Sequence, residues 1–75
     1  MVKLPALTST QVVRALVRAG FVKDRQRGSH LVLWHPDRKA LTIVPIHSRR
    51  TIKKPLLRAI IADAKLTIEA FLELL

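Results

Sequence analysis

The spacing of apolar residues along the chain predicts a helix, then three strands, then two further helices. Thr8 and Gln11 form a capping box ahead of apolar residues at helical spacing, and Gly20 is a typical stop signal. We therefore predict a first helix between Thr8 and Gly20. The following segments predict strands over Phe21–Gln26, Ser29–Trp34 and Ala40–Val44.

Turn residues separate the three predicted strands. Arg27–Gly28 is expected to join the first two strands, and His35–Arg38 contains the Pro and Asp that favour a tight turn. Pro45 ends the third strand, because a proline has no N–H to donate to the sheet.

Two helices complete the predicted fold. The second starts near Lys54, where Pro55 suits the first helical position, and its apolar stripe reaches Ala64. Thr67 can cap a short last helix that carries Phe71 on its apolar side. The order α-β-β-β-α-α predicts an α+β fold with helices on one face of a three-stranded antiparallel sheet, and we expect residues 1–75 to form one domain.

The orientation of the second strand decides whether His30 is accessible. Leu31 and Leu33 point to one side of this strand, whereas His30, Val32 and Trp34 point to the other. If the leucines pack under the helices, His30 lies on the opposite, accessible face. The alternative places Val32 and Trp34 in the core, and the pattern leaves it open.

Charge is the most informative bulk property. Fourteen Lys and Arg face five Asp and Glu, which gives a formal net charge of +9. The excess is concentrated in residues 1–61, where 13 basic residues face two acidic ones, while residues 62–75 hold one basic and three acidic residues. Such a field attracts polyanions, so nucleic acid is the expected partner. An acidic protein, a membrane surface or a merely solubilising surface are the alternatives.

Several classes of protein are disfavoured by what the sequence lacks. It has no Cys, so a disulfide framework and a Cys-based zinc site are excluded. No apolar run approaches the roughly 20 residues that span a bilayer, and residues 1–20 do not resemble a signal peptide, so we expect a cytoplasmic protein. Acidic residues do not cluster around any His, and a glycine-rich phosphate loop is missing, so we expect neither a metal nor a cofactor.

His30 is the leading candidate for chemistry. It follows Gly28–Ser29 at the start of a strand, with Arg25 and Arg27 just upstream. A His can accept or donate a proton near neutral pH, and RNA carries its own nucleophile, the 2′-hydroxyl. Metal-free cleavage then needs only a base, an acid and cations around the phosphate. A structural role for a lone His in a strand is the alternative.

The other candidates are two His residues, one Trp and the basic runs. His35 lies five residues from His30, and this odd offset puts them on opposite faces, so a structural role is expected for His35. His47 can serve a loop or touch phosphate. Trp34 can stack on an unpaired base, or belong to the core or to an interface. The basic runs ahead of the second helix predict a phosphate-docking surface formed by Arg49, Arg50, Lys53 and Lys54. A solvated loop is the alternative.

Several short runs together resemble the HicA toxin family. Their order and spacing match over nearly the whole chain without insertion, beginning with the segment from Leu4 to Phe21. The further matching runs are Gly28–His30, His35–Asp37, Val44–Ser48, Ile52–Lys53 and Leu66–Leu72.

This resemblance implies a fold like that of the double-stranded-RNA-binding domain, α-β-β-β-α, here with a short additional C-terminal helix. It implies a toxin that cleaves mRNA without a metal, arrests translation and is neutralised by a HicB-type antitoxin protein, with which we expect a higher-order complex. The family's essential His falls on His30, and Gly28 and Ser29 fall on the positions that shape its turn.

Two positions depart from the family pattern. Pro55–Leu56 stands where many members carry Gly–Thr at the start of the second helix, and Pro is tolerated there. Lys65 stands where many members have Gly at the end of that helix. We therefore expect Lys65 to adopt a left-handed conformation, unless the helix ends differently.

Three functions stay open on the sequence alone. The first is an endoribonuclease that uses His30, with His47 and Lys53 as candidates for the general acid. The second is a non-catalytic module that binds structured RNA through shape and phosphate contacts. The third is a subunit whose main role is to carry the antitoxin. The RNA preference and the oligomeric state of the free chain are not determined.

Overall fold

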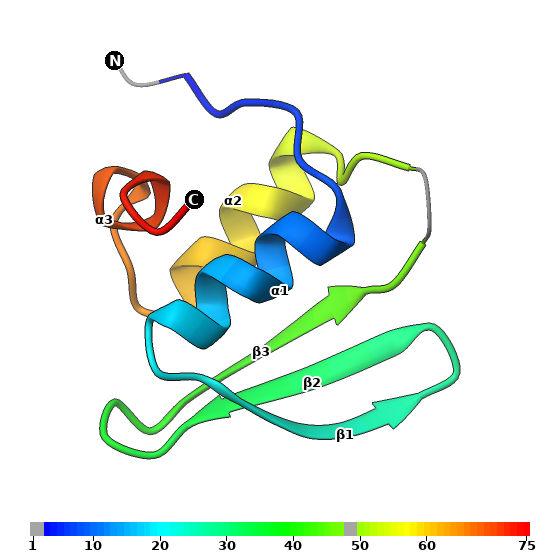
Figure 1. The fold of residues 1–75 in the computed structure, drawn as a ribbon, viewed down its shortest axis with the longest axis vertical. Coiled ribbons are helices and arrows are strands. Elements are labelled where there is room, and N and C mark those ends of the chain that lie inside the picture. Colours follow the sequence, from blue (N-terminus) through cyan, green and yellow to red (C-terminus); the bar gives the residue numbers. More distant parts are fainter. Residues whose placement is uncertain (1–2, 48–49) are drawn as a thin grey trace.

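The computed structural model describes residues 3–47 and 50–75, and these residues form the predicted order of elements. The helices of this part of the chain lie on one side of a three-stranded antiparallel sheet (Figure 1). The α+β prediction is therefore confirmed. The elements are α1 (Ser9–Arg18), β1 (Val22–Arg27), β2 (His30–His35), β3 (Ala40–Pro45), α2 (Lys54–Asp63) and α3 (Ile68–Leu72).

The two ends of α1 follow from its sequence. The Thr8 hydroxyl accepts a hydrogen bond from the Gln11 backbone N–H at 3.3 Å, and the Gln11 side chain accepts one from the Thr8 N–H at 2.9 Å. This capping box satisfies N–H groups that the helix itself leaves unpaired. At the other end, Gly20 has a φ of 104°, which side-chain-bearing residues rarely adopt, so the helix stops there.

The strand boundaries differ from the predicted ones by about one residue. Arg27 pairs with His30 and is the last residue of β1, so the first turn is Gly28–Ser29 and not Arg27–Gly28. His35, predicted as a turn residue, pairs with Ala40 and ends β2. Boundaries of this kind depend on cross-strand pairing, which the residues of one strand do not reveal.

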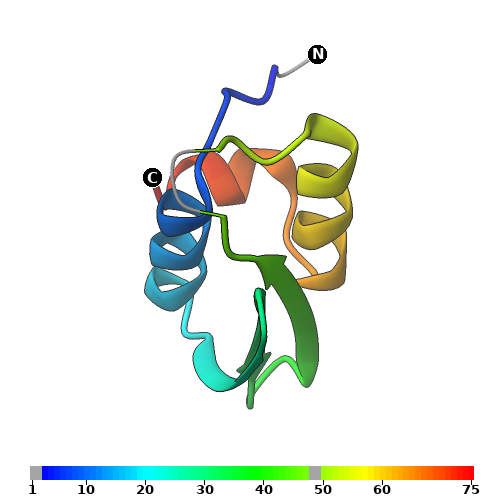
Figure 2. The ribbon, with the colours of Figure 1, turned by 90° about the vertical axis from the view of Figure 1, so that its right-hand side faces the viewer.

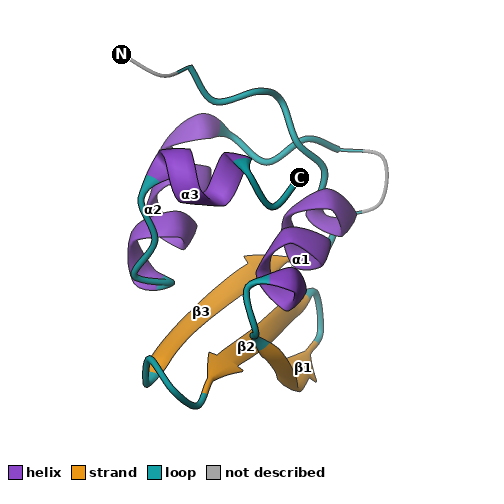
Figure 3. Cartoon of the chain, turned by 60° about the vertical axis from the view of Figure 1, so that its left-hand side comes forward, coloured by secondary structure: helices purple, strands orange, loops and turns teal. Residues whose placement is uncertain are grey.

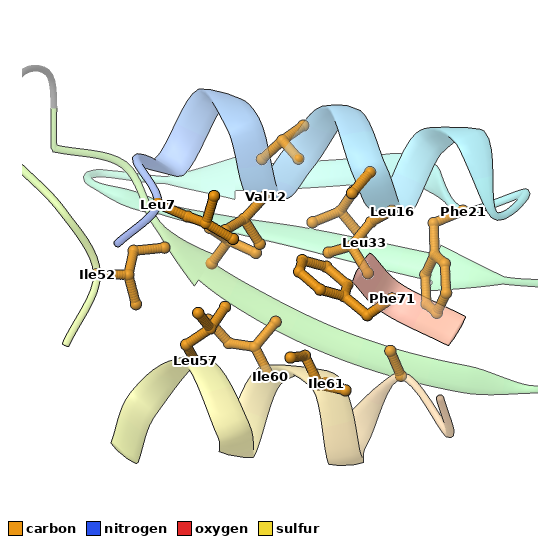
Figure 4. Packing of buried hydrophobic residues seen from close by; sticks show 14 of the residues in the cluster. Leu7, Val12, Leu16, Phe21, Leu33, Ile52, Leu57, Ile60, Ile61 and Phe71 are labelled. Carbon is orange, nitrogen blue, oxygen red and sulfur yellow. The ribbon is translucent and has the colours of Figure 1, made fainter. Parts of the chain in front are cut away.

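The core lies between the sheet and the helices (Figure 4). Leu16 of α1, Leu33 of β2 and Phe71 of α3 are fully buried there. Each comes from the apolar stripe of its helix or the inward side of its strand, so every one of these elements turns one face to the core.

β3 is the strand that lies next to α2 (Figure 2). The buried Thr42 hydroxyl donates a hydrogen bond to the Ile60 carbonyl oxygen at 3.2 Å and thereby joins the two elements. Because α2 begins at Lys54, Pro55 is its second residue and not its first. Both positions suit Pro, because the N–H groups of the first helical turn have no acceptor within the helix. Lys65 has the expected left-handed conformation, with a φ of 59°.

The face of the sheet opposite the helices is left uncovered (Figure 3). On the helical side, the segment ahead of α2 is tied to the start of α1, because the Ile52 N–H donates to the Leu7 carbonyl oxygen at 2.7 Å. Within the described residues, no helix has the length and apolar character needed to cross a bilayer.

Candidate active site

His30 is the first residue of β2 and lies on the face of the sheet that no helix covers. Leu31 and Leu33 alternate with it and are buried in the core, so the His30 side chain projects the other way. Val32, the next residue on the His30 face, is only 6% exposed, yet it does not belong to the core cluster. His30 itself is exposed to solvent. The accessible orientation is therefore the one that the fold adopts.

Three cross-strand rows of residues make up this open face. The row that contains His30 has Arg27 on one side and Pro45 on the other. The second row consists of Arg25, Val32 and Ile43, and the third of Val22, Trp34 and Leu41. The face therefore changes from basic beside His30 to apolar around Trp34, which is half-buried and outside the core.

A β-bulge in β1 places the arginines beside His30. Lys23 pairs with Leu33 and Arg25 pairs with Val32, so Asp24 is one extra residue in β1. In a regular strand without a bulge, the alternation from Val22 would run through Asp24 unbroken, and the two arginines of β1 would turn toward the helices. The bulge reverses the alternation. As a result, Arg25 and Arg27 line a hollow of about 390 Å³ together with His30, Val32 and Ile43.

The turn before His30 depends on Gly28. Its φ is +56°, whereas Ser29 is not among the described residues with positive φ, and this pattern is typical of a two-residue type II′ hairpin turn. A Cβ atom on Gly28 would meet no atom within 4 Å, so the backbone conformation, and not lack of space, favours glycine here. The Ser29 carbonyl oxygen accepts a hydrogen bond from the Ile46 N–H at 2.6 Å, which holds the turn against the end of β3.

The end of β3 is held in turn by Ser9, a residue that the sequence analysis missed. Its buried hydroxyl donates to the Pro45 carbonyl oxygen at 2.8 Å and accepts from the His47 N–H at 3.1 Å. No pattern in the sequence distinguishes Ser9, which simply follows the capping residue Thr8. Its contacts join residues 36 and 38 positions apart, and only the fold brings those together.

The predicted phosphate-docking residues are brought together in part. Arg50 and Lys53 line a hollow of about 260 Å³ with Ser9, Pro45 and His47. Lys54, the first residue of α2, is exposed and does not line this hollow. Arg49 lies outside the described residues. The N-terminus of α2 has no side-chain cap, because Lys53 precedes it.

A groove between β3 and α2 connects these features. It has a volume of about 340 Å³, and His30 forms part of its wall. Pro45 and Leu56 line both this groove and the hollow that contains His47, Arg50 and Lys53 (the basic hollow), so the two lie next to each other. His30 therefore lies where the groove and the arginine row adjoin, and Pro45, its cross-strand partner, also borders the basic hollow. Figure 1 shows that the β1–β2 turn and the end of β3 lie at the same end of the sheet.

His35 has a structural position, as its offset from His30 predicts. It is 7% exposed, and its ring packs edge-on against Phe21 with 5.0 Å between the ring centroids. Nδ1 lies 3.2 Å from the Arg38 N–H and accepts its hydrogen bond, so Nε2 carries the proton that it shares with the Ala19 carbonyl oxygen at 2.9 Å. A Cβ atom on Gly20 would come within 2.8 Å of Nε2, so glycine is also needed for space there.

Within residues 3–47 and 50–75, no three His, Asp or Glu residues gather as a metal-ligand set would. On the open face, the side chains that line the hollow with His30 are cationic or apolar instead. Such an arrangement can bind an anion and transfer a proton at the same place.

Comparison with known families agrees with the resemblance noted from the sequence. The family model described as the HicA toxin of bacterial toxin–antitoxin systems matches residues 9–66, which is more than three quarters of the chain. Comparison with curated proteins gives no match. The matched region runs from the first residue of α1 to the segment after α2 and includes the whole sheet. The chain therefore belongs to the HicA toxin family, the toxins of bacterial toxin–antitoxin systems, and membership implies an antitoxin as its partner.

Proposed function

We propose that this toxin is a metal-independent endoribonuclease that cleaves mRNA, with His30 as the general acid or base. One observation carries the proposal: His30 is exposed where the arginine row and the groove adjoin, and its cross-strand partner Pro45 borders the basic hollow. A cleaving enzyme needs a proton-transferring group within reach of a bound phosphate, and this position meets that need.

The chemistry follows from the substrate. The 2′-oxygen of a ribose attacks the adjacent phosphorus, the bond from phosphorus to the 5′-oxygen breaks, and the products are a 2′,3′-cyclic phosphate and a 5′-hydroxyl. One group must take the 2′-hydroxyl proton, and another must give a proton to the 5′-oxygen. We assign one of these transfers to His30. The partner group is proposed to be His47 or Lys53, across Pro45 from His30.

The cations would bind the phosphates and stabilise the negative charge that develops in the transition state. Arg25 and Arg27 are proposed to act on the open face, and Arg50 and Lys53 in the basic hollow. Arg49 and Lys54 are proposed to add to the positive field ahead of α2. The formal net charge of +9 supports capture of a polyanion.

Residues 1–75 are proposed to act as one toxin domain in the cytoplasm, where mRNA is translated. We further propose that its antitoxin is of the HicB type, and that toxin and antitoxin assemble into a higher-order complex. Binding of the antitoxin would then relieve the arrest of translation.

The test compares the wild-type chain with His30→Ala on a long unstructured RNA in excess EDTA. We expect the wild type to cleave the RNA to products with cyclic-phosphate ends, and the variant to lose at least 100-fold in rate, a typical effect of removing a general acid or base. His30 is exposed and outside the core, so the variant should unfold at the same urea concentration as the wild type.

His47→Ala is measured beside it to test the second proton transfer, because it also removes an exposed His near the same end of the sheet. Equal loss in both variants would implicate His47 in the second proton transfer. Cleavage that survives in His30→Ala would contradict the assignment. Tight RNA binding by both proteins without cleavage would favour the alternative, a non-catalytic RNA-binding module regulated by its protein partner.

A further inference from the structure

The groove between β3 and α2 contains a charge that phosphate binding does not explain. Asp63 lines it together with His30, and it is the one acidic residue among those that line the groove or the adjoining basic hollow. Asp63 is also the last residue of α2, where the helix dipole disfavours a negative side chain. Neither helix stability nor attraction of RNA therefore accounts for a carboxylate at this position.

The walls of the groove suit a flat, apolar object. Aliphatic side chains from both elements line it, with Leu41 and Ile43 from β3 and Leu56 and Ala59 from α2. Leu41, Ile43 and Leu56 are between 43% and 45% exposed, which is unusual for large aliphatic residues lying close together. A nucleobase has apolar faces and a polar edge, so these walls could contact its faces while its edge reaches a polar group.

Leu56, which lines the groove with His30, and Asp63 are about as far apart along α2 as the two ends of one nucleotide. Leu56 and Pro45 meet beside His30, and Thr42 contacts Ile60 further along, so α2 runs antiparallel to β3. The seven helical steps from Leu56 to Asp63 correspond to roughly 10 Å along the helix, at about 1.5 Å per residue. This separation is comparable to that between a phosphate and the far edge of the base in the same nucleotide.

We infer that the groove between β3 and α2 binds one unpaired base of the RNA next to the phosphate at His30, and that Asp63 selects guanine there. Guanine presents two adjacent N–H donors, N1–H and N2–H, and the two carboxylate oxygens of Asp63 can accept both. Adenine and cytosine offer one amino group each, and uracil places a carbonyl oxygen on either side of its single N–H donor. This inference rests on the proposed function for its substrate class, because it extends the same site.

The test measures base preference in binding and in cleavage separately. Labelled heptamers of uridine, with guanosine, inosine, adenosine or uridine at the central position, are titrated with His30→Ala, in which cleavage is expected to be at least 100-fold slower than in the wild type. Inosine lacks only the 2-amino group of guanosine. We expect the guanosine RNA to bind about tenfold more tightly than the inosine or uridine RNA, the effect of one well-formed hydrogen bond. The wild type should cleave next to guanosine with the same preference.

Two variants and one control connect this preference to the groove. In the His30→Ala background, Asp63→Asn keeps the shape of the side chain but removes one acceptor, and Ala59→Leu fills the groove. Both should bring the guanosine and inosine RNAs to within about twofold of each other. Ala62→Leu adds the same bulk at an exposed position of α2 outside the groove, and it should preserve the preference.

Each result distinguishes base selection in the groove from simple repulsion of phosphate by Asp63 or from a protein interface. If Asp63→Asn raises the affinity for all four RNAs equally, Asp63 only repels phosphate and the inference is wrong. The same holds if the His30→Ala protein binds all four RNAs equally, even when the wild type cleaves RNA. Conversely, a guanosine preference that depends on Asp63 in a protein that cuts no RNA would support the inference and reject the enzyme. If Ala59→Leu weakens only the binding of an antitoxin, the groove belongs to a protein interface and base selection is overturned.

Discussion

Arg38 and Lys65 each donate a hydrogen bond to the other's backbone carbonyl oxygen. The Arg38 Nη1 atom lies 2.9 Å from the Lys65 oxygen, and the Lys65 Nζ atom lies 3.2 Å from the Arg38 oxygen. Two side chains of like charge thus join the β2–β3 turn to the segment between α2 and α3. Both bonds are exposed, so each contributes modestly to stability. The left-handed φ of Lys65, 59°, has the larger effect on stability, and it is unfavourable because the residue carries a Cβ atom.

The first prediction concerns this left-handed residue. Lys65→Gly should be more stable than Lys65→Ala by about 1 kcal/mol, because both lose the lysine side chain and only glycine adopts a φ of this sign without strain. In both variants the Lys65 carbonyl oxygen stays available to Arg38. Urea unfolding of the two proteins measures the difference. Equal stabilities would mean that the segment after α2 relaxes when the side chain is shortened.

The second prediction concerns His35. We expect His35→Ala to lower the free energy of unfolding by about 2–4 kcal/mol, because it leaves a cavity beside Phe21 and removes both hydrogen bonds of the buried ring. His30→Ala is the matched control, since the same change at an exposed position should cost less than about 0.5 kcal/mol. A similar loss from both would show that His35 is not the structural His of the pair.

The third prediction concerns Ser9. Ser9→Ala leaves the Pro45 carbonyl oxygen and the His47 N–H without their partner, so we expect a loss of about 1–3 kcal/mol in unfolding free energy. Under conditions where the variant stays folded, RNA cleavage should also slow, because Ser9 holds one wall of the basic hollow. Thr10→Ala, at the adjacent exposed residue of α1, serves as the control for helix effects. Unchanged stability in Ser9→Ala would argue that water replaces the hydroxyl.

The fourth prediction tests the β-bulge. Arg27 and Lys23 lie on the same strand, but Arg27 shares a row with His30 while Lys23 lines a hollow on the α1 side with Thr10 and Arg14. Arg27→Ala should reduce kcat/KM on RNA about tenfold, which corresponds to about 1.4 kcal/mol of transition-state stabilisation. Lys23→Ala removes the same formal charge and should change kcat/KM less than about threefold. Equal effects would mean that net charge, and not the face of the sheet, determines activity.

The elements of this fold could be predicted from the sequence because their signals are local. The capping box of Thr8 and Gln11 operates within one turn of helix, and the structure contains both of its hydrogen bonds. The alternation of Leu31 and Leu33 with His30 likewise needs only the geometry of one strand. The left-handed conformation of Lys65 was expected from the family resemblance, because many members carry Gly at this position.

The composition of the candidate site could be predicted only in part. His30 was identified from its motif and charge, and the basic residues around it from their number. The sequence places Arg25 and Arg27 a few residues before His30, but it does not show which face of β1 they occupy. Regular alternation from Val22 would predict that both arginines face the helices. The bulge at Asp24 reverses this, and no feature of the sequence indicates the bulge.

The sequence by itself therefore determined the order of the elements, the inward side of α1, the net charge and the family, but it left open which side of β2 faces the core. Each of these depends on residue types a few positions apart or on the whole set of residues. Tertiary structure alone decided the bulge in β1, the hydrogen bonds of Ser9 and the groove that is lined by both Asp63 and His30. These features depend on pairing and packing between residues distant along the chain, and no local pattern encodes them.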